Sequence, residues 1–128
     1  MLNSNIGNIK KHYFTSVFGS VANVAKNVWA KSNKDITVSE SGIYIVNFPF
    51  LRDQGGVDTA YLTQIKIDTS DSLPSNQEPD MGCVATNWSI TSMTYLCELQ
   101  AGKTYHIWLR HTASKTHTID YHCYYAKM

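Results

Sequence analysis

The chain has 128 residues, of which 43% are hydrophobic and 16% charged, and its formal net charge is +1. This composition excludes a disordered chain and predicts a single folded domain over residues 1–128, in which residues 1–11 form an N-terminal arm or the remnant of a linker. The near-neutral charge and the lack of a basic run exclude the electrostatic signature of nucleic-acid binding, and no apolar run is long enough to insert into a membrane as a helix.

The N-terminal segment MLNSNIGNIKKHY contains no apolar stretch followed by a cleavage site, so no signal peptide is visible. Three explanations stay open. The protein remains in a cytosol, or it leaves the cell by assembly into a particle or by lysis, or the sequence was trimmed. The low content of charged residues is more typical of secreted or particle-borne β proteins than of highly charged cytosolic ones.

Strand signals begin with HYFTSVF, residues 12–18, which is rich in β-branched and aromatic residues and ends at Gly19. The next segment, residues 21–32, is ambiguous, because its valines at spacings of three and four also fit a helix. Its β-rich surroundings favour a strand from about Asn23 to Lys31. DITVSESG, residues 35–42, then predicts a short strand and a turn.

The segment SGIYIVNFPF, residues 41–50, is apolar on both faces of the strand that it predicts. One face carries an alternating series of Tyr44, Val46, Phe48 and Phe50. The other face carries Ile43 and Ile45. A strand with one face in water shows polar residues on that face, so we expect both faces of this strand to be covered.

TAYLTQIKID, residues 59–68, predicts another strand, after the turn cluster RDQGGVD at residues 52–58. TSDSLPSNQEPD, residues 69–80, is the longest loop and contains two prolines and many small polar residues. Loops of this kind often carry recognition residues, although a solvated connector has the same composition.

Four further strand segments follow, separated by short turns: MGCVATNWSI, SMTYLCELQ, TYHIWLRHT and THTIDYHCYYAKM. In the third of them, Tyr105, Ile107 and Leu109 are predicted to face inward and His106, Trp108 and Arg110 outward. In the last, His117, Ile119, Tyr121, Cys123 and Tyr125 alternate with Thr118, Asp120, His122 and Tyr124. The chain as a whole predicts an all-β, antiparallel jelly-roll sandwich of about eight to ten strands.

The order of these motifs resembles the complement globular-head and tumour-necrosis-factor-like jelly rolls. The resemblance covers roughly Asp35 to Met128. It rests on Gly42-Ile43-Tyr44 in an early strand, on Leu99 to Lys103 before an alternating apolar strand, and on the aromatic strand from Ile119 to Tyr125. No collagen repeat or calcium-type carboxylate cluster accompanies the motifs, which argues against a complement or cytokine role. The pattern fits a similar module of a bacteriophage tail fibre, baseplate or neck appendage.

The resemblance implies a threefold assembly of identical chains. Ile43 and Ile45 would then pack toward the symmetry axis or under a second layer, and His106, Trp108 and Tyr124 are further candidates for the trimer interface. An alternative is that the N-terminal segment of the same chain covers the two isoleucines.

The histidines raise the question of a metal site. His106 and His122 would share an outward face with Asp120 if their strands paired, and two imidazoles and a carboxylate can bind Zn²⁺ or Ni²⁺. Polar residues on a half-exposed sheet or at an interface explain the same pattern, so we expect no cofactor. The odd set of cysteines, Cys83, Cys97 and Cys123, predicts buried thiols, with a Cys97–Cys123 disulfide left open.

Catalytic motifs are not apparent in the sequence. No serine lies in a Gly-x-Ser-x-Gly elbow, and the acidic residues of the loops have no recognisable frame for glycoside hydrolysis. The sequence therefore predicts a protein that is not an enzyme, with a small carbohydrate-acting enzyme as the less favoured alternative.

Eight tyrosines and three tryptophans favour a binding role, because their rings supply amphipathic contact surface. The candidate ligand-binding residues are Trp88, Asn76, Glu78, Asp80, Arg52 and Asp53. We interpret the chain as a trimeric receptor-binding or adhesion head of a viral, most simply phage, particle, located in the virion or outside the cell after assembly or lysis. It would bind a host-surface saccharide or protein. A purely structural trimerisation or capsid-decoration module is the alternative.

Overall fold

The computed structural model describes residues 14–54, 61–85 and 90–128 of the chain, all of them in strands, turns and loops. Its eight strands are β1 (Thr15–Val24), β2 (Ala30–Ile36), β3 (Gly42–Gln54), β4 (Tyr61–Asp68), β5 (Met81–Ala85), β6 (Ile90–Leu99), β7 (Tyr105–His111) and β8 (His117–Lys127). The described residues contain no helix that is long and apolar enough to span a membrane.

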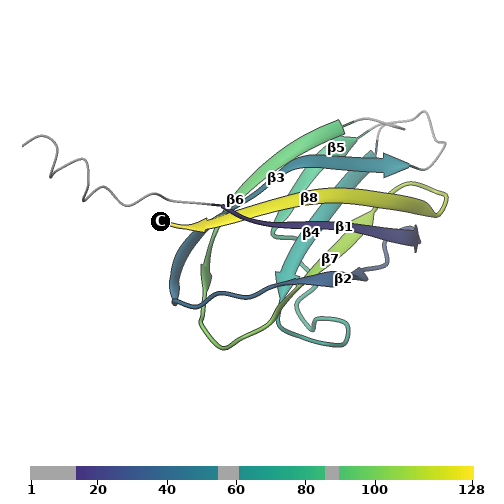
Figure 1. Cartoon of the computed structure of the whole chain (residues 1–128). Coiled ribbons are helices and arrows are strands. Elements are labelled where there is room, and N and C mark those ends of the chain that lie inside the picture. The colour runs from purple at the N-terminus through teal and green to yellow at the C-terminus, as the bar shows by residue number, and fades with distance from the viewer. Residues whose placement is uncertain (1–13, 55–60, 86–89) are drawn as a thin grey trace, which may run out of the picture.

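The strands form two four-stranded antiparallel sheets that face one another (Figure 1). The strand order is β1-β8-β3-β6 in the first, called sheet I here, and β2-β7-β4-β5 in the second, called sheet II. Most connections cross from one sheet to the other, as they do in a jelly roll. The all-β sandwich predicted from the strand signals is therefore confirmed.

The core lies between the sheets and consists of the inward side chains of both. The alternation predicted for the last strand is confirmed, because Ile119, Tyr121 and Cys123 are fully buried. The Tyr121 hydroxyl reaches across to Ser32 of β2 at 2.5 Å and so links the two sheets. A side chain at Gly19, the β1 partner of Tyr121, would overlap the tyrosine ring, which explains a glycine inside this strand.

The strand predicted from Asn23 to Lys31 is wrong. Asn23 and Asn27 both have positive φ, of 59° and 58°, and the chain turns between β1 and β2. Asparagine tolerates this left-handed conformation better than most residues, and it interrupts both a strand and a helix. The first strand, predicted over residues 12–18, instead runs from Thr15 through Gly19 to Val24.

Phe50 does not share the inward face of β3, contrary to the sequence prediction. Phe48 and Leu51 are both buried in the core, and the pairing of β3 with β6 shifts between them. Such a bulge inserts an extra residue and reverses the alternation that follows it. Phe50 therefore points away from the core, where its ring stacks on His122 of β8.

The three cysteines are free thiols. Cys97 of β6 and Cys123 of β8 lie on strands that flank β3 on opposite sides. Two strand spacings separate their backbones by roughly 10 Å, which is beyond the reach of a disulfide. The Cys97–Cys123 bridge left open by the sequence is therefore absent.

Candidate functional site

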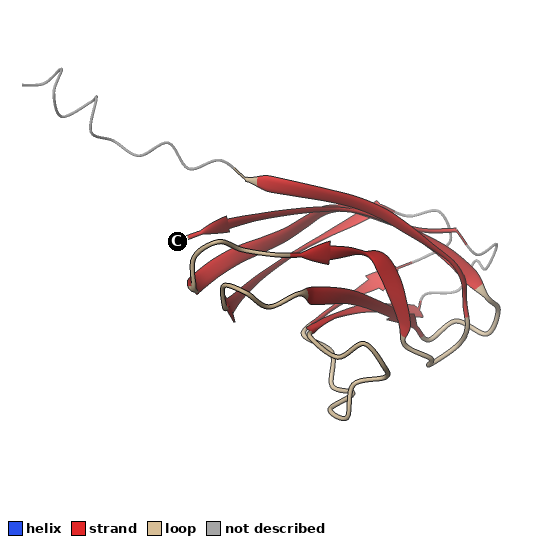
Figure 2. Ribbon diagram, turned by 60° about the horizontal axis from the view of Figure 1, so that its bottom comes forward, coloured by secondary structure: helices blue, strands red, loops and turns tan. Residues whose placement is uncertain are grey.

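The outer face of sheet II is covered by the chain's own loop of residues 69–80, which connects β4 to β5 (Figure 2). Three contacts tie the loop down. The Trp29 indole N–H donates to the Gln77 carbonyl at 3.2 Å, and the Lys66 ammonium donates to the Glu78 carbonyl at 3.0 Å. Asp71 makes the third contact, with His106. The longest loop is thus a docked cover in this structure.

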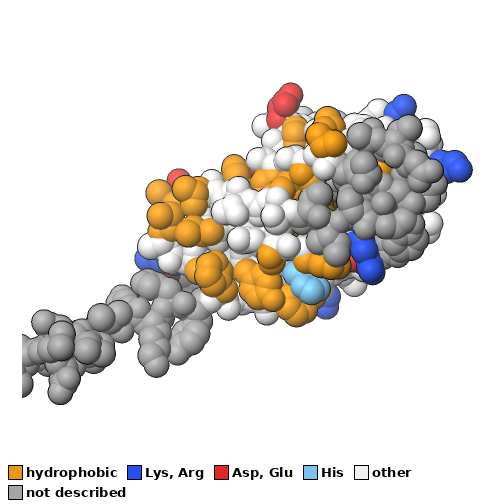
Figure 3. Space-filling model, turned by 90° about the horizontal axis from the view of Figure 1, so that it is seen from above, with side chains coloured by type: hydrophobic (Ala, Val, Ile, Leu, Met, Phe, Trp, Pro, Cys, Tyr) orange, Lys and Arg blue, Asp and Glu red, His pale blue; other side chains and the backbone are white. Residues whose placement is uncertain are grey.

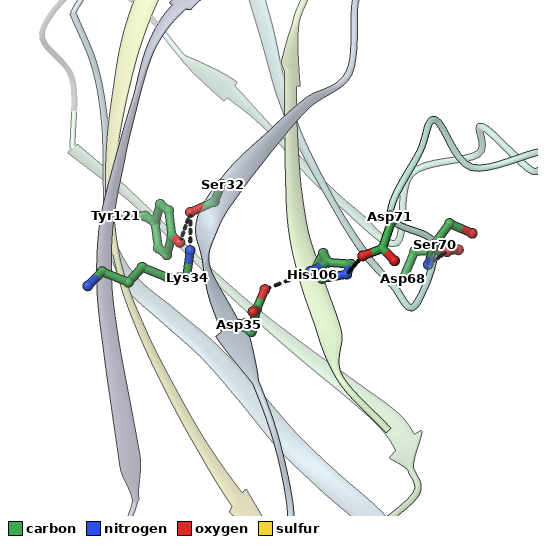
Figure 4. A network of polar contacts seen from close by, with 8 residues as sticks. All are labelled: Ser32, Lys34, Asp35, Asp68, Ser70, Asp71, His106 and Tyr121. Carbon is green, nitrogen blue, oxygen red and sulfur yellow. Dashed lines mark hydrogen bonds and ion pairs between the residues drawn. The ribbon is translucent and has the colours of Figure 1, made fainter. Parts of the chain in front are cut away.

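His106 is the centre of this attachment (Figure 4). Its Nδ1 lies 2.7 Å from Asp35 Oδ1 of β2, and its Nε2 lies 2.8 Å from Asp71 Oδ1 of the loop. Each ring nitrogen thus faces a carboxylate oxygen. We call this pair of contacts the His106 clip, which joins the loop to the edge of sheet II.

Two of the predicted trimer-interface residues lie beneath this cover. His106 and Trp108 point away from the core as predicted, but both are buried, with Trp108 only 5% exposed. Tyr124 lies on β8 in sheet I, and so it does not share a surface with them. The structure thus separates His106 and Trp108 from Tyr124, which alternation along the strands did not reveal, and a role of these residues in a trimer stays a prediction.

The weak metal candidates of the sequence, His106, His122 and Asp120, do not come together. His106 lies on β7 in sheet II, whereas Asp120 and His122 lie on β8 in sheet I. Strands β7 and β8 do not pair, so the three side chains belong to opposite faces of the sandwich. Within residues 14–54, 61–85 and 90–128, no group of three His, Cys, Asp or Glu side chains is placed to hold a metal ion.

The outer face of sheet I has no such cover among the described residues, and one end of it is apolar. Ile43 is 56% exposed there, and Ile45 is half-buried beside it. The neighbouring side chains complete what we call the apolar end, which consists of Phe14, Ile43, Ile45, Leu96, Ala126 and Met128. Figure 3 shows hydrophobic side chains gathered along this side of the molecule.

A row of aromatic rings crosses the middle of the same face. The His122 ring lies 4.2 Å from that of Phe18 on β1 and 4.6 Å from that of Phe50 on β3, measured between ring centroids. The Arg52 guanidinium lies 5.8 Å from the Phe50 centroid. The row therefore spans three strands and ends in a cation.

Beyond the aromatic row, the face is hollowed and polar. The hollow measures about 500 Å³. It is bordered by residues of β1, β3 and β8 in sheet I, the aromatic row among them, and by Asn33 and Lys34 of β2. Arg52 forms an ion pair with Asp120 at 2.9 Å, and the Ser20 hydroxyl donates to the other oxygen of Asp120 at 2.6 Å. We call this region the polar hollow, and it combines apolar rings with fixed charges.

The structure divides the predicted ligand-binding residues. Arg52 lies in the polar hollow, whereas Asn76, Glu78 and Asp80 belong to the loop on the other side of the sandwich. Asp80 has a structural role there, because its carboxylate accepts the Ile67 N–H at 2.7 Å. Burial raises the pKa of this carboxyl, although the Ile67 N–H and the charge of Lys66 act in the opposite direction.

The structure does not test two of the predicted ligand-binding residues. Trp88 and the side chain of Asp53 lie outside the described residues. The sequence interpretation missed four members of the hollow, namely Phe18, Ser20, Asn33 and Lys34. The outward positions of Phe18 and Ser20 were readable from alternation, but the pairing of β1 with β8 that brings them beside His122 and Asp120 was not.

The buried thiols are poor nucleophiles. Burial raises the pKa of Cys97 to about 11 and that of Cys123 to about 12, with smaller contributions from neighbouring charges. Both thiols are therefore protonated at neutral pH, and only a thiolate attacks effectively. Neither has the electropositive, accessible surroundings of a catalytic cysteine.

No protein-family model and no curated protein sequence matches the chain. Among solved structures, the chain is similar to Eiger TNF from S. frugiperda, with a TM-score of 0.55 and 14% identity over 90% of this chain and 92% of that one. It is also similar to the carbohydrate-binding module CBM6cm-2 of Cellvibrio mixtus lichenase 5A in complex with cellotriose (TM-score 0.47, 11% identity, 95% and 93% coverage). A third similar structure is a family 35 carbohydrate-binding module from Clostridium thermocellum, with a TM-score of 0.48 and 14% identity over 90% of this chain and 98% of that one.

At these identities the likeness concerns the fold alone. The similarity with the highest TM-score, to Eiger TNF, agrees with the tumour-necrosis-factor-like jelly roll that the sequence motifs resemble.

Proposed function

We propose that the chain is a non-enzymatic adhesion head that assembles as a homotrimer and binds a saccharide or protein on a cell surface. The observation that carries the proposal is the apolar end of sheet I, where Ile43, Leu96 and Phe14 are all more than half exposed in the single chain. Contiguous apolar surface of this kind is uncommon on monomers and marks interaction sites.

Burial of the apolar end between copies supplies the driving force for assembly. Each isoleucine, leucine or phenylalanine side chain that moves from water into an interface contributes roughly 1.5–3 kcal/mol. A threefold arrangement is the one that the resemblance to tumour-necrosis-factor-like jelly rolls implies. Ile43 and Ile45 would lie close to the symmetry axis, which accounts for a strand that is apolar on both faces.

Ligand binding is assigned to the polar hollow at the opposite end of the same face. Three copies in one assembly would raise the avidity of a weak single site without new contacts. The setting that we propose is a viral, most simply phage, particle, where such a head meets the host surface after assembly or lysis.

A purely structural module is the second candidate function. The exposure of the apolar end favours it as strongly, because a trimerisation or capsid-decoration module needs that surface and no ligand. The two candidates differ in whether the assembled protein attaches to a surface.

The first test is the mass of the protein in solution. Analytical ultracentrifugation is expected to give three times the chain mass of 14.4 kDa. Ile43→Glu places a charge in the apolar end and is expected to yield monomers. Val84→Glu is the matched control, because Val84 is equally exposed, at 64%, but lies on β5 of sheet II.

The outcomes separate the candidates. A wild-type species of 14.4 kDa at high concentration, or dissociation by Val84→Glu as readily as by Ile43→Glu, contradicts assembly through the apolar end. A trimer that binds no saccharide on a glycan array and no cell surface supports the structural module. A trimer that binds is an adhesion head.

A further inference from the structure

The polar groups around the polar hollow differ in how far they are already satisfied. Both carboxylate oxygens of Asp120 accept hydrogen bonds, one from Ser20 and one from Arg52. The Tyr121 hydroxyl is bonded to Ser32. The acceptors that border the hollow are therefore largely engaged inside the protein.

The hydrogen-bond donors that border the hollow have fewer partners inside the protein than the acceptors do. Arg52 uses one Nη for Asp120, but its Nε is buried and has no acceptor among the described residues. Lys34 is exposed at the rim and forms no ion pair within residues 14–54, 61–85 and 90–128. The Nε is too buried for a ligand to reach. The Arg52 side chain as a whole is 39% exposed and Lys34 is exposed, so a ligand that supplies an acceptor can meet both cations. The hollow is thus short of acceptors.

The charge of the residues around the hollow also favours a ligand that supplies acceptors. Lys34 and Arg52 contribute two cations, and among the described side chains Asp120 is the only anion that borders it. A guanidinium presents its Nε and Nη donors as a planar fork that matches a carboxylate or a sulfate. The net charge favours an anionic group next to Arg52.

The aromatic row adds an apolar wall. The His122 ring stacks on that of Phe50 and lies tilted by 36° against that of Phe18, and all three residues border the hollow. Phe18 is 50% exposed and offers the largest apolar contact. A ligand with a C–H-rich ring and several oxygens suits this wall.

We propose that the polar hollow binds an anionic saccharide, through a carboxylate or sulfate group held by Arg52 and Lys34 and a sugar ring placed against Phe18. This inference rests on the proposed adhesion function and names its ligand class. The volume of about 500 Å³ lies in the range of small-molecule sites and opens to solvent, as the end of a longer glycan requires. Two cations are too few for the phosphate contacts of a nucleic acid.

The test measures binding of three related oligosaccharides to the full chain by isothermal titration calorimetry. Lactose has no charge, 3′-sialyllactose adds a carboxylate, and lactose 3′-sulfate adds a sulfate. We expect at least one of the anionic sugars to bind roughly 10-fold or more tightly than lactose, because hydrogen bonds to charged groups are the strong ones. Their relative affinities distinguish a carboxylate from a sulfate as the natural group.

Variants of the hollow locate the site. Arg52→Gln is expected to weaken binding of the anionic sugar roughly 10- to 100-fold, and Lys34→Gln roughly 2- to 5-fold, because Lys34 is exposed. Lys103→Gln removes the same charge from the turn between β6 and β7 and is expected to leave binding unchanged. Raising the ionic strength from 0.05 to 0.5 M weakens binding by screening, and this effect is smaller in Lys34→Gln.

Each outcome bears on the proposal. Arg52→Gln leaves Asp120 without its ion pair, so its folding is checked by thermal unfolding, and Lys34→Gln keeps the test decisive if the arginine variant does not fold. Equal affinity for lactose and both anionic sugars, or equal weakening by Lys103→Gln and Lys34→Gln, overturns the anionic-saccharide site. The absence of binding to all three sugars overturns it as well. Attachment of the same preparation to cells would then show that the adhesion function stands without this ligand class.

Discussion

The outer faces of the two sheets differ in which side chains they expose to water. On sheet II, the polar residues Lys66 and His106 are buried beneath the 69–80 loop. On sheet I, the apolar residues Ile43 and Leu96 are more than half exposed. Water would ordinarily favour the reverse, since apolar surface gains from burial and charge loses from it.

The difference shows which outer face the described residues of the chain cover and which they leave exposed. On sheet II the chain supplies its own cover, and two buried polar groups there receive a partner from it, a carbonyl for Lys66 and a carboxylate for His106. On sheet I the described residues supply no cover for the apolar end. We therefore look for partners, whether other copies or ligands, on sheet I.

The largest expected effect comes from one aromatic substitution on each face. Trp108→Ala opens a cavity under the loop and is expected to lower the free energy of unfolding by about 3–5 kcal/mol. Phe18→Ala removes an exposed ring that contacts His122 and is expected to cost less than about 1.5 kcal/mol. Urea denaturation at concentrations that give monomers measures both. Similar losses for the two variants would remove the distinction between a covered and a bare face.

A smaller effect is expected from the His106 clip. His106→Gln removes the ion pairs to Asp35 and Asp71 and is expected to cost about 1–3 kcal/mol and to speed hydrogen exchange across residues 69–80. Asp71→Asn serves as the control. Its side chain is 90% exposed, so the loss should stay below about 1 kcal/mol. Unchanged exchange in His106→Gln would show that the loop is held by other contacts.

The last prediction concerns the inner side of sheet I, and its effect is absent at neutral pH and seen only at alkaline pH. Burial raises the pKa of Cys123 and of Tyr121 to about 12, above the values of roughly 8.5 and 10 in an unfolded chain. Above these unfolded values the native state binds more protons than the unfolded state, so the free energy of unfolding falls as the pH rises. It should be flat from pH 7 to 8 and decline above about pH 9. A rise in stability over that range would contradict the burial of these groups.

Much of the sandwich was predictable from local patterns. Strict alternation in the last strand identified Ile119, Tyr121 and Cys123 as core residues, because the period of a strand is two and one face was apolar. The bulge after Phe48 was not predictable, since one extra residue leaves the composition of the segment unchanged and reverses the face of Phe50. The turn at Asn23 and Asn27 was hidden by the valines around it.

The candidate site was predictable only in part. Arg52 was identified beforehand as a ligand-binding candidate, and Asp120 and His122 were identified for a metal site that the topology excludes. The remaining members of the hollow come from β1 and β2, far from them along the chain. Their proximity depends on which strands pair, and pairing is a long-range property that residue order does not display.

The sequence by itself determined the all-β class, most of the strands and the two apolar faces of β3, because hydrophobic periodicity and turn residues act over a few neighbouring positions. The tertiary structure alone decided which outer face is covered. Loop 69–80 folds over sheet II because its carbonyls and Asp71 meet Lys66, Trp29 and His106 there, from strands and turns distant in the chain. These contacts exist only once the strands have taken their order, and among the described residues they leave the outer face of sheet I without such a cover.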